Sequence, residues 1–180
     1  KKSSFGPTAK TGGSHYVSMF REYQPVENIE SLKYEFKLTW EETGNKSIKL
    51  GDTESERNFK RYVPYKSILL VTEEDFSKDL ESFIFWISEL LNINIKITSE
   101  VTLLSPDSNL DPSLFEKIRW IATSQEIPTQ IFNSGATVDE RGLSQNGKQE
   151  LLCWVKEQSI SITNHRYGNI GSGPQPFKDW

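Results

Sequence analysis

The sequence predicts an α+β fold, an antiparallel β-sheet packed against a helical bundle. Two segments, residues 32–41 and 93–97, alternate apolar with polar side chains, as half-buried strands do. A third segment, residues 76–91, repeats apolar side chains at helical spacing. The expected order of strand hairpin, strand, helix, strand and helix indicates an α+β class, with an antiparallel sheet packed on helices.

The chain of 180 residues is long enough for one domain with a substantial core. It opens on lysine rather than methionine, so we expect it to be a piece of a longer polypeptide. Residues 1–28 are rich in Gly, Ser and Lys and are predicted as an irregular arm. Residues 29–165 are predicted to form the domain, and residues 166–180 a C-terminal tail or linker.

Strand signals dominate the first part of the domain. The alternation in residues 32–41 predicts a strand with one apolar and one polar face. Gly44-Asn45 supplies a turn, and residues 47–50 resume the alternation, which together predict a β-hairpin. The polar segment at residues 51–60 is predicted as a protruding loop, and the apolar run at residues 67–71 as a buried strand.

The clearest helix begins at Thr72, which can cap the free backbone amides with Asp75 three residues further on. Residues 93–97 return to strand alternation, and residues 105–109 have turn composition. Asp111-Pro112 is a typical helix start, with apolar residues following at helical spacing.

The signals weaken beyond Pro128. Residues 148–156 suggest a short helix, and residues 160–163 a strand.

Composition disfavours most catalytic and nucleic-acid-binding classes. The 21 Lys and Arg against 25 Asp and Glu give a net charge of −4, whereas a protein that grips many phosphates is basic. One cysteine, Cys153, and two histidines make a zinc site difficult to build. The sequence contains no phosphate-binding loop or nucleophile elbow and no apolar stretch of transmembrane length. We therefore expect a non-catalytic protein without metal or cofactor.

A binding module is more plausible, because the chain contains five tryptophans. Two opposed aromatic planes and a carboxylate would suit a methylated purine, whose positive charge favours ring stacking.

The order of several short segments resembles the cap-binding domain of influenza-type polymerase basic protein two. The segments are Phe5-Gly6 with a basic arm, the strand at residues 31–42, the strand and long helix at residues 68–91, Leu110-Asp111-Pro112, and Ile131-Phe132-Asn133. The resemblance covers roughly residues 3–140 and needs one insertion between residues 51 and 60. It implies a sheet packed on a helical bundle that holds the 7-methylguanosine cap of host RNA between two aromatic rings.

Some of the residues that the resemblance implies are present here. The base-reading glutamate corresponds to Glu41, and the aromatic near the ribose to Phe5. The lysine at the base edge falls near Lys60. These three positions keep the chemistry that the family uses around the cap.

Other positions depart from the family pattern. The two stacking aromatics correspond to Lys37 and Leu90, and an asparagine near the phosphates to Asp111. Because stacking contributes about 1–3 kcal/mol per base, losing both planes predicts little or no cap binding. This pattern suggests a divergent, thogotovirus-like member with a degraded pocket.

Three functional hypotheses remain. The first is a structural, subunit-interface domain of a viral RNA polymerase, with the other polymerase subunits as partners, RNA contacted only locally, and the host nucleus and virion as its location. The second is a competent cap binder used in cap-snatching, with a relocated sandwich built from Trp40 or Trp86. The third is an unrelated α+β enzyme or interaction module.

Overall fold

The computed structural model has a mixed α and β fold, which confirms the predicted α+β class. Its described residues form a four-stranded parallel sheet, which packs against the helices, a three-stranded antiparallel sheet and a small two-stranded antiparallel pair. The structure describes residues 17, 24–52, 56–100, 104, 110–163, 165–166 and 169–170. Most of the predicted arm and tail, and the turn at residues 105–109, lie outside these residues. None of the described helices is both long and apolar enough to span a membrane.

The body of the molecule is built on a four-stranded parallel sheet. Its strand order is β4-β3-β5-β6, and every neighbouring pair is parallel. The strands are β3 (Ser67–Val71), β4 (Asn94–Thr98), β5 (Lys117–Trp120) and β6 (Thr137–Asp139). The connection from β3 to β4 contains the helix α3 (Lys78–Leu91), and that from β5 to β6 contains the short helix α4 (Thr129–Asn133).

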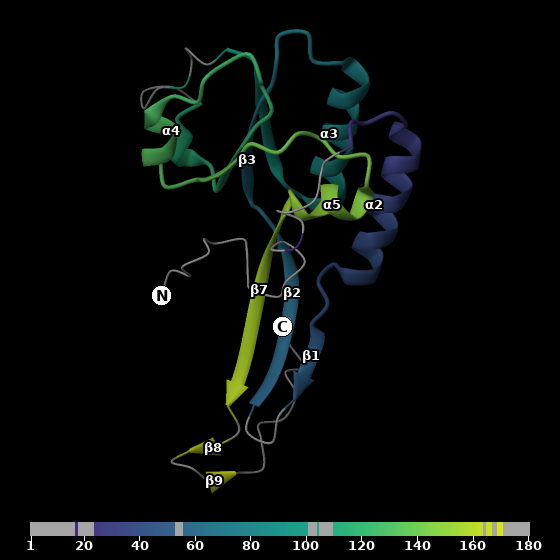
Figure 1. Ribbon diagram of the computed structural model, residues 1–180, viewed down its shortest axis with the longest axis vertical. Coiled ribbons are helices and arrows are strands. Elements are labelled where there is room, and N and C mark those ends of the chain that lie inside the picture. Colours follow the sequence, from purple (N-terminus) through teal and green to yellow (C-terminus); the bar gives the residue numbers. More distant parts are fainter. Residues whose placement is uncertain are drawn as a thin grey trace.

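Two hydrophobic clusters cover the two faces of this sheet. On one face, Ile68 and Leu70 pack with α3, α5 (Gly147–Leu152) and the outer helix α2 (Ile29–Thr43). On the other face, Leu69 and Val71 pack with Ile131 of α4. Figure 1 shows the same division, with α2, α3 and α5 on one side and α4 on the other.

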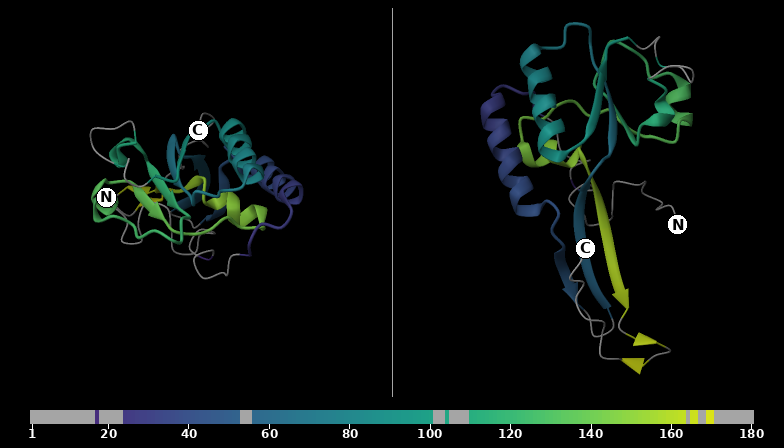
Figure 2. Two further views of the ribbon diagram at one scale, coloured as in Figure 1. Left: turned by 90° about the horizontal axis from the view of Figure 1, so that it is seen from above. Right: turned by 180° about the vertical axis from the view of Figure 1, so that it is seen from behind.

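A three-stranded antiparallel ribbon, called the ribbon below, projects from this body (Figures 1 and 2). Its order is β1-β2-β7, and β2 pairs with β7 from Glu56↔Thr163 to Pro64↔Val155. The strands are β1 (Ile48–Asp52), β2 (Glu56–Pro64) and β7 (Val155–Thr163), followed by the small pair β8 (His165–Arg166) and β9 (Asn169–Ile170).

The strand predicted at residues 32–41 is wrong, because this segment forms α2. Asn28 caps the helix by accepting a hydrogen bond from the Ser31 backbone N at 2.9 Å. Leu32, Phe36 and Trp40 satisfy a spacing of four as well as a spacing of two, and the first two are fully buried. The intervening Tyr34 and Leu38, which a strand would have buried, are 70% and 44% exposed.

Two further predictions are wrong. The polar segment at residues 51–60 contains the end of β1 and half of β2, so the hairpin partner of β1 is β2 rather than residues 32–41. The helix predicted from Asp111 is a single 3₁₀ turn, Pro112–Leu114, followed by β5. The first error arises because the strand residues at 57–60 are polar or charged for the most part and only half-buried, as in a loop. The second arises because apolar residues that fit a helical spacing include Ile118, which lies on β5.

The remaining elements are confirmed with shifted ends. The buried strand at residues 67–71 is β3, and residues 93–97 correspond to β4. The long helix α3 begins at Lys78 rather than at Thr72, whose backbone N instead donates to Thr98 O. The short helix at residues 148–156 is present as α5 but ends at Leu152, and residues 160–163 lie within β7.

Candidate functional site

The residues that the cap-binding resemblance singled out do not form a common site. Lys37 and Glu41 lie on the outer face of α2, where each side chain is 59% exposed and the two are 3.8 Å apart across one helical turn. The prediction that they line a sheet face is wrong because the segment is helical. An exposed ion pair at this spacing is typical of a solvated helix surface.

The other cap-site candidates have separate structural roles. Leu90 packs half-buried against the core, and Lys60 lies on β2 with its ammonium 5.5 Å from the Tyr62 ring centre. Asp111 caps the 3₁₀ turn by accepting from Ser113 N at 2.8 Å. Phe5 lies outside the described residues. Among the described residues, the structure therefore does not gather this set into one pocket.

The two alternative stacking residues belong to the core between α2 and α3. Trp86 stacks on Phe83, with ring centres 5.8 Å apart and planes inclined by 19°, and meets Phe36 edge-on at 5.7 Å. The Trp40 ring lies against Gly44, where a Cβ atom would overlap it. Both tryptophans are therefore held by internal packing rather than facing each other across an open slot.

The parallel sheet has a topological switch point between β3 and β5. The connections that leave these neighbouring strands cross opposite faces, with α3 on one and α4 on the other. In sheets of this kind, ligands bind in the crevice at the carboxyl ends of the strands beside the switch point. The residues that follow β3 and β5 are therefore the first place to look for a ligand site.

This crevice is occupied by the chain itself. The Glu73 carboxylate, after β3, accepts hydrogen bonds from Ser124 N at 2.9 Å, Thr123 Oγ1 at 3.1 Å and the Ser124 hydroxyl, all after β5. These hydrogen bonds, those from Ser124 first, lower the pKa of Glu73. An internal carboxylate thus takes the backbone and hydroxyl donors that a ligand phosphate would otherwise use.

A shallow pocket of about 540 Å³ lies beside Glu73 at the same edge. Its lining includes two carboxylates and no Lys or Arg, so it repels an anionic ligand. The lining residues are Trp120, Ala122, Thr123, Gln125, Glu126, Ile127, Phe132 and Glu140.

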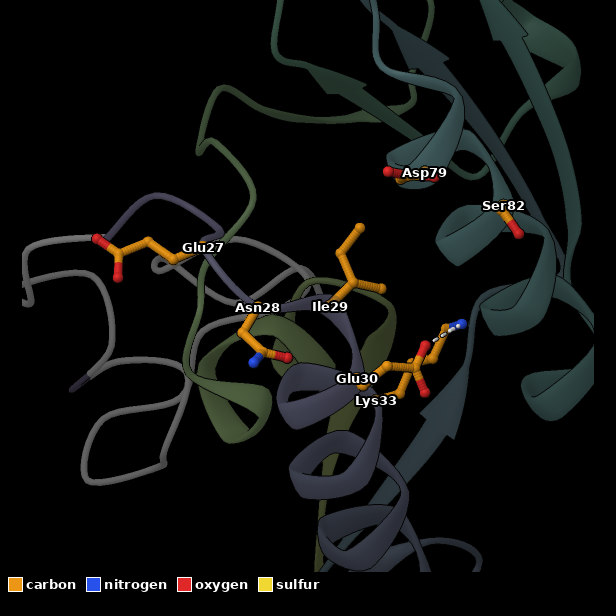
Figure 3. A pocket seen from close by; sticks show the side chains of 7 residues that line it. All are labelled: Glu27, Asn28, Ile29, Glu30, Lys33, Asp79 and Ser82. Carbon is orange, nitrogen blue, oxygen red and sulfur yellow. Dashed lines mark hydrogen bonds and ion pairs between the residues drawn. The ribbon is translucent and has the colours of Figure 1, made fainter.

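A second pocket, of about 400 Å³, lies between the starts of α2 and α3 (Figure 3). Its polar groups already serve the fold: Asn28 caps α2, and Lys33 pairs with Glu30 at 3.0 Å. Glu27 and Asp79 add two carboxylates. Within the described part of the chain, no group of three His, Cys, Asp or Glu side chains is arranged to hold a metal ion.

The most concentrated chemistry is a buried ion network on β5, which sequence reasoning missed. The Lys117 ammonium contacts Asp139 Oδ2 at 2.6 Å and the Cys153 carbonyl at 2.5 Å, and Arg141 pairs with the same carboxylate at 2.6 Å. Burial lowers the pKa of Lys117. Burial would raise the pKa of Asp139, but Lys117 and Arg141 outweigh it and hold that pKa well below its usual range.

Two residues further along β5, Arg119 forms a fully buried two-point contact with Glu150 of α5. The two nitrogen–oxygen distances are 2.5 and 3.0 Å, and the guanidinium lies 4.9 Å from the Trp154 ring centre. The Trp154 indole N–H also donates to Glu150, at 2.8 Å, and Ser144 N donates at 2.9 Å. Every strong polar group of this pair is satisfied internally, so the network joins α5 to the sheet.

The sequence contained only a weak signal for this network. Lys117 and Arg119 alternate with Ile118 and Trp120, which is also the pattern of a half-exposed strand. All four side chains are buried, because both faces of β5 are covered. Only the position of α5 shows that the face of β5 with Lys117 and Arg119 points into the body.

The ribbon offers a surface at which another chain could pair. Along its projecting part, the β7 residues Ser159 and Ser161 are exposed, and Ile160 and Ile162 are half-buried. Among the described strands, β7 pairs with β2 alone, so no described strand covers its outer edge. A free strand edge is a template for pairing with another chain.

Comparisons with known proteins bear on the fold. Neither a protein-family model nor a curated protein matches this chain. A solved structure of Proline Utilization A (PutA) from Corynebacterium freiburgense is similar, with a TM-score of 0.62 and 21% sequence identity. The similarity covers 92% of this chain and 18% of that chain. This likeness concerns the fold, and the chain spans less than a fifth of the length of the protein that it matches.

Proposed function

We propose that this chain is a non-catalytic assembly domain, in which an α/β body held together by buried ion pairs presents the ribbon for docking to another protein. The observation that carries the proposal is the projection of β2 and β7 beyond the body, with a β7 edge on which no described strand pairs. A ribbon of this kind is marginal by itself, because strands gain most of their stability by packing against other elements. A docking partner supplies that packing.

The organisation of the body supports a role without catalysis. Catalytic sites gather titratable groups with perturbed pKa values in an open cleft. In this chain three groups with strongly shifted pKa values are held in buried ion pairs inside the body: Lys117 pairs with Asp139, and Arg119 pairs with Glu150. At the switch point, Glu73 takes the backbone and hydroxyl donors of Ser124 and the hydroxyl of Thr123.

The likeness to one part of a much longer chain supports placing this domain within a larger polypeptide or assembly. By that likeness, we propose a surrounding protein of the Proline Utilization A type.

A photo-crosslinking experiment tests the docking function. A photo-reactive phenylalanine derivative replaces Ser159 on β7 or, as a control of comparable exposure, Glu41 on α2. In cells that make the protein naturally, we expect a discrete crosslinked product from position 159 alone, and its loss when Ile160→Lys is added. The partner, identified by mass spectrometry and purified, should restore the product in vitro. Identical product patterns from both positions would contradict the proposal.

Membership of an orthomyxovirus polymerase, with other polymerase subunits as partners in the host nucleus, stays a prediction of the sequence resemblance. Two segments that carry that resemblance, residues 31–42 and the segment opened by Asp111, have a different secondary structure here. Titration with 7-methylguanosine triphosphate, read by tryptophan fluorescence with GTP as control, tests cap binding. We expect no methyl-selective quenching up to millimolar ligand; quenching at micromolar ligand would favour a competent cap site.

A further inference from the structure

The projecting part of β7, residues 159–163, lacks the features that usually prevent strand edges from pairing. Natural edge strands carry charges, prolines or bulges that block a further strand. Residues 159–163 read Ser-Ile-Ser-Ile-Thr, with no charge, proline or glycine. Isoleucine and threonine are also among the residues that favour strands. This edge is therefore suited to accept another strand.

The opposite edge of the ribbon is protected. On β1, the register with β2 shifts between Lys49 and Gly51, which is a bulge-type irregularity. Lys49 and Leu50 are both exposed there. A bulge and a lysine at an edge oppose regular pairing. Among the described strands, the ribbon thus has one protected edge, on β1, and one unpaired edge, on β7, and a partner strand should add to β7.

The β7 edge is self-complementary. In an antiparallel pair of two copies with Ser161 opposite Ser161, Ile160 lies opposite Ile162, and Ser159 lies opposite position 163. Isoleucine then meets isoleucine and small hydroxyl residues meet small hydroxyl residues, and directly opposite side chains of this kind stabilise a sheet. Strand alternation places Ile160 and Ile162 on one face and Ser159 and Ser161 on the other.

The neighbouring strand extends the apolar face. Phe59 of β2 lies directly opposite Ile160 of β7. Pairing of two β7 edges would therefore join the Phe59 and isoleucine side chains of both copies into one stripe on a single face. A two-fold axis at Ser161 makes the contact isologous, so it closes as a dimer and does not propagate into a fibre.

We propose that the partner of the β7 edge is a second copy of this chain, paired antiparallel about Ser161 to give a six-stranded sheet. The inference rests on the assembly function proposed above and identifies the chain that docks on the β7 edge. Five residues per copy form a small contact compared with stable interfaces, so we expect a weak dimer, with a dissociation constant between about 10 μM and about 1 mM.

Cysteine substitutions test the pairing and its register. Residues directly opposite in an antiparallel pair have Cα atoms about 4.5 or 5.5 Å apart, within disulfide range. Ser161→Cys, which changes a single atom of the side chain, should therefore form disulfide-linked dimers under mild oxidation. Ser159→Cys, two positions from the axis, should not. The native Cys153 does not interfere, because it is buried and burial raises the pKa of its thiol.

A mixed experiment checks the register independently. Ile160→Cys and Ile162→Cys chains should each form no disulfide-linked dimer alone and should crosslink when mixed. Sedimentation analysis of the unmodified chain should show a rise in mean mass across the expected concentration range. Ile160→Lys should abolish this rise, whereas Leu38→Lys on the exposed face of α2 should leave it unchanged.

Equal crosslinking of Ser159→Cys and Ser161→Cys, or a monomer at all concentrations, would overturn self-pairing. If β7 nevertheless captures a different protein in the photo-crosslinking experiment, the docking function stands with a foreign strand as its occupant. If both experiments fail, the docking function fails as well.

Discussion

The body strand β5 and the ribbon strand β7 both alternate between two kinds of side chain. The polar side chains of β5 are buried and paired, whereas those on the projecting part of β7 are exposed. On β5, Lys117 and Arg119 point into the body, where their side chains are 2% and 0% exposed and meet buried carboxylates. On β7, Val155 is fully buried at the body, whereas Ser159 and Ser161 are exposed on the ribbon.

This difference suggests that the body determines the stability of the chain and that the ribbon determines its association with other chains. The body encloses its charges, so removing Arg119 leaves Glu150, and removing Asp139 leaves Lys117, without its counter-charge in a medium of low polarity. The ribbon leaves a strand edge uncovered, so changes there should alter association more than folding. Four substitutions, ordered from the largest expected effect on stability to the smallest, test this contrast.

Arg119→Ala should have the largest effect. It leaves the Glu150 carboxylate fully buried without its cation, which costs about 3–5 kcal/mol of unfolding free energy. Urea unfolding followed by tryptophan fluorescence measures the change. The double variant Arg119→Met, Glu150→Leu should recover much of the loss, because it removes both charges and fills a similar volume. A loss below 1 kcal/mol in the single variant would show that the pair is not enclosed.

Asp139→Asn should destabilise the chain by about 3 kcal/mol at pH 7, because Lys117 loses its buried counter-charge. The pKa of Asp139 is lower in the folded state than the value of about 3.9 expected when unfolded. Its stabilising contribution is therefore complete above that value and is lost as the pH falls below it. The stability difference between wild type and variant should narrow below about pH 4, as measured by urea unfolding across pH. A difference independent of pH would argue against a carboxylate pair.

Ile160→Lys should cost about 1 kcal/mol or less, since Ile160 is only half-buried on the ribbon. Its effect should appear instead in sedimentation analysis, as described above. The comparison between body and ribbon would break if this variant unfolded as easily as Arg119→Ala, because the ribbon would then belong to the cooperative core.

Lys37→Ala should change stability by no more than about 0.5 kcal/mol. Its ion pair with Glu41 is 59% exposed at both side chains and spans one helical turn. Thermal unfolding at low and high salt measures the effect, which should vanish at high salt because solvent ions screen the pair. A larger or salt-independent loss would indicate that Lys37 has another role.

The periodicity of apolar residues correctly located the helices and strands whose sequence pattern fits only one kind of secondary structure. The run of apolar residues in β3, the amphipathic α3 and the following strand β4 were predicted from sequence and are present. The segment of α2 allowed two interpretations, a strand or a helix, because residues that recur every four positions also fit an alternation of two. The Asn28 cap and the first-turn Glu30 pointed to the helix. Competing periodicities cannot be resolved without knowing which face another element covers.

The candidate site was likewise only partly predictable from the sequence. Composition argued against phosphate-rich ligands, and the structure adds Glu73 in the switch-point crevice, which depends on two loops 50 residues apart. The cap-site positions were carried over by order along the chain, and the structure places them on separate elements. Sequence order did not determine proximity, because proximity depends on the layers into which the elements pack.

The sequence by itself determined the α+β class, the strong elements between residues 67 and 98, and the uncharged edge of β7. Tertiary structure decided that β3 to β6 run parallel, that Lys117 and Arg119 point inward, and that β2 and β7 leave the body together. Local patterns fix what a segment can form and bury. Which faces are covered depends on contacts between residues far apart in the chain, such as Arg119 with Glu150 and Phe59 with Ile160.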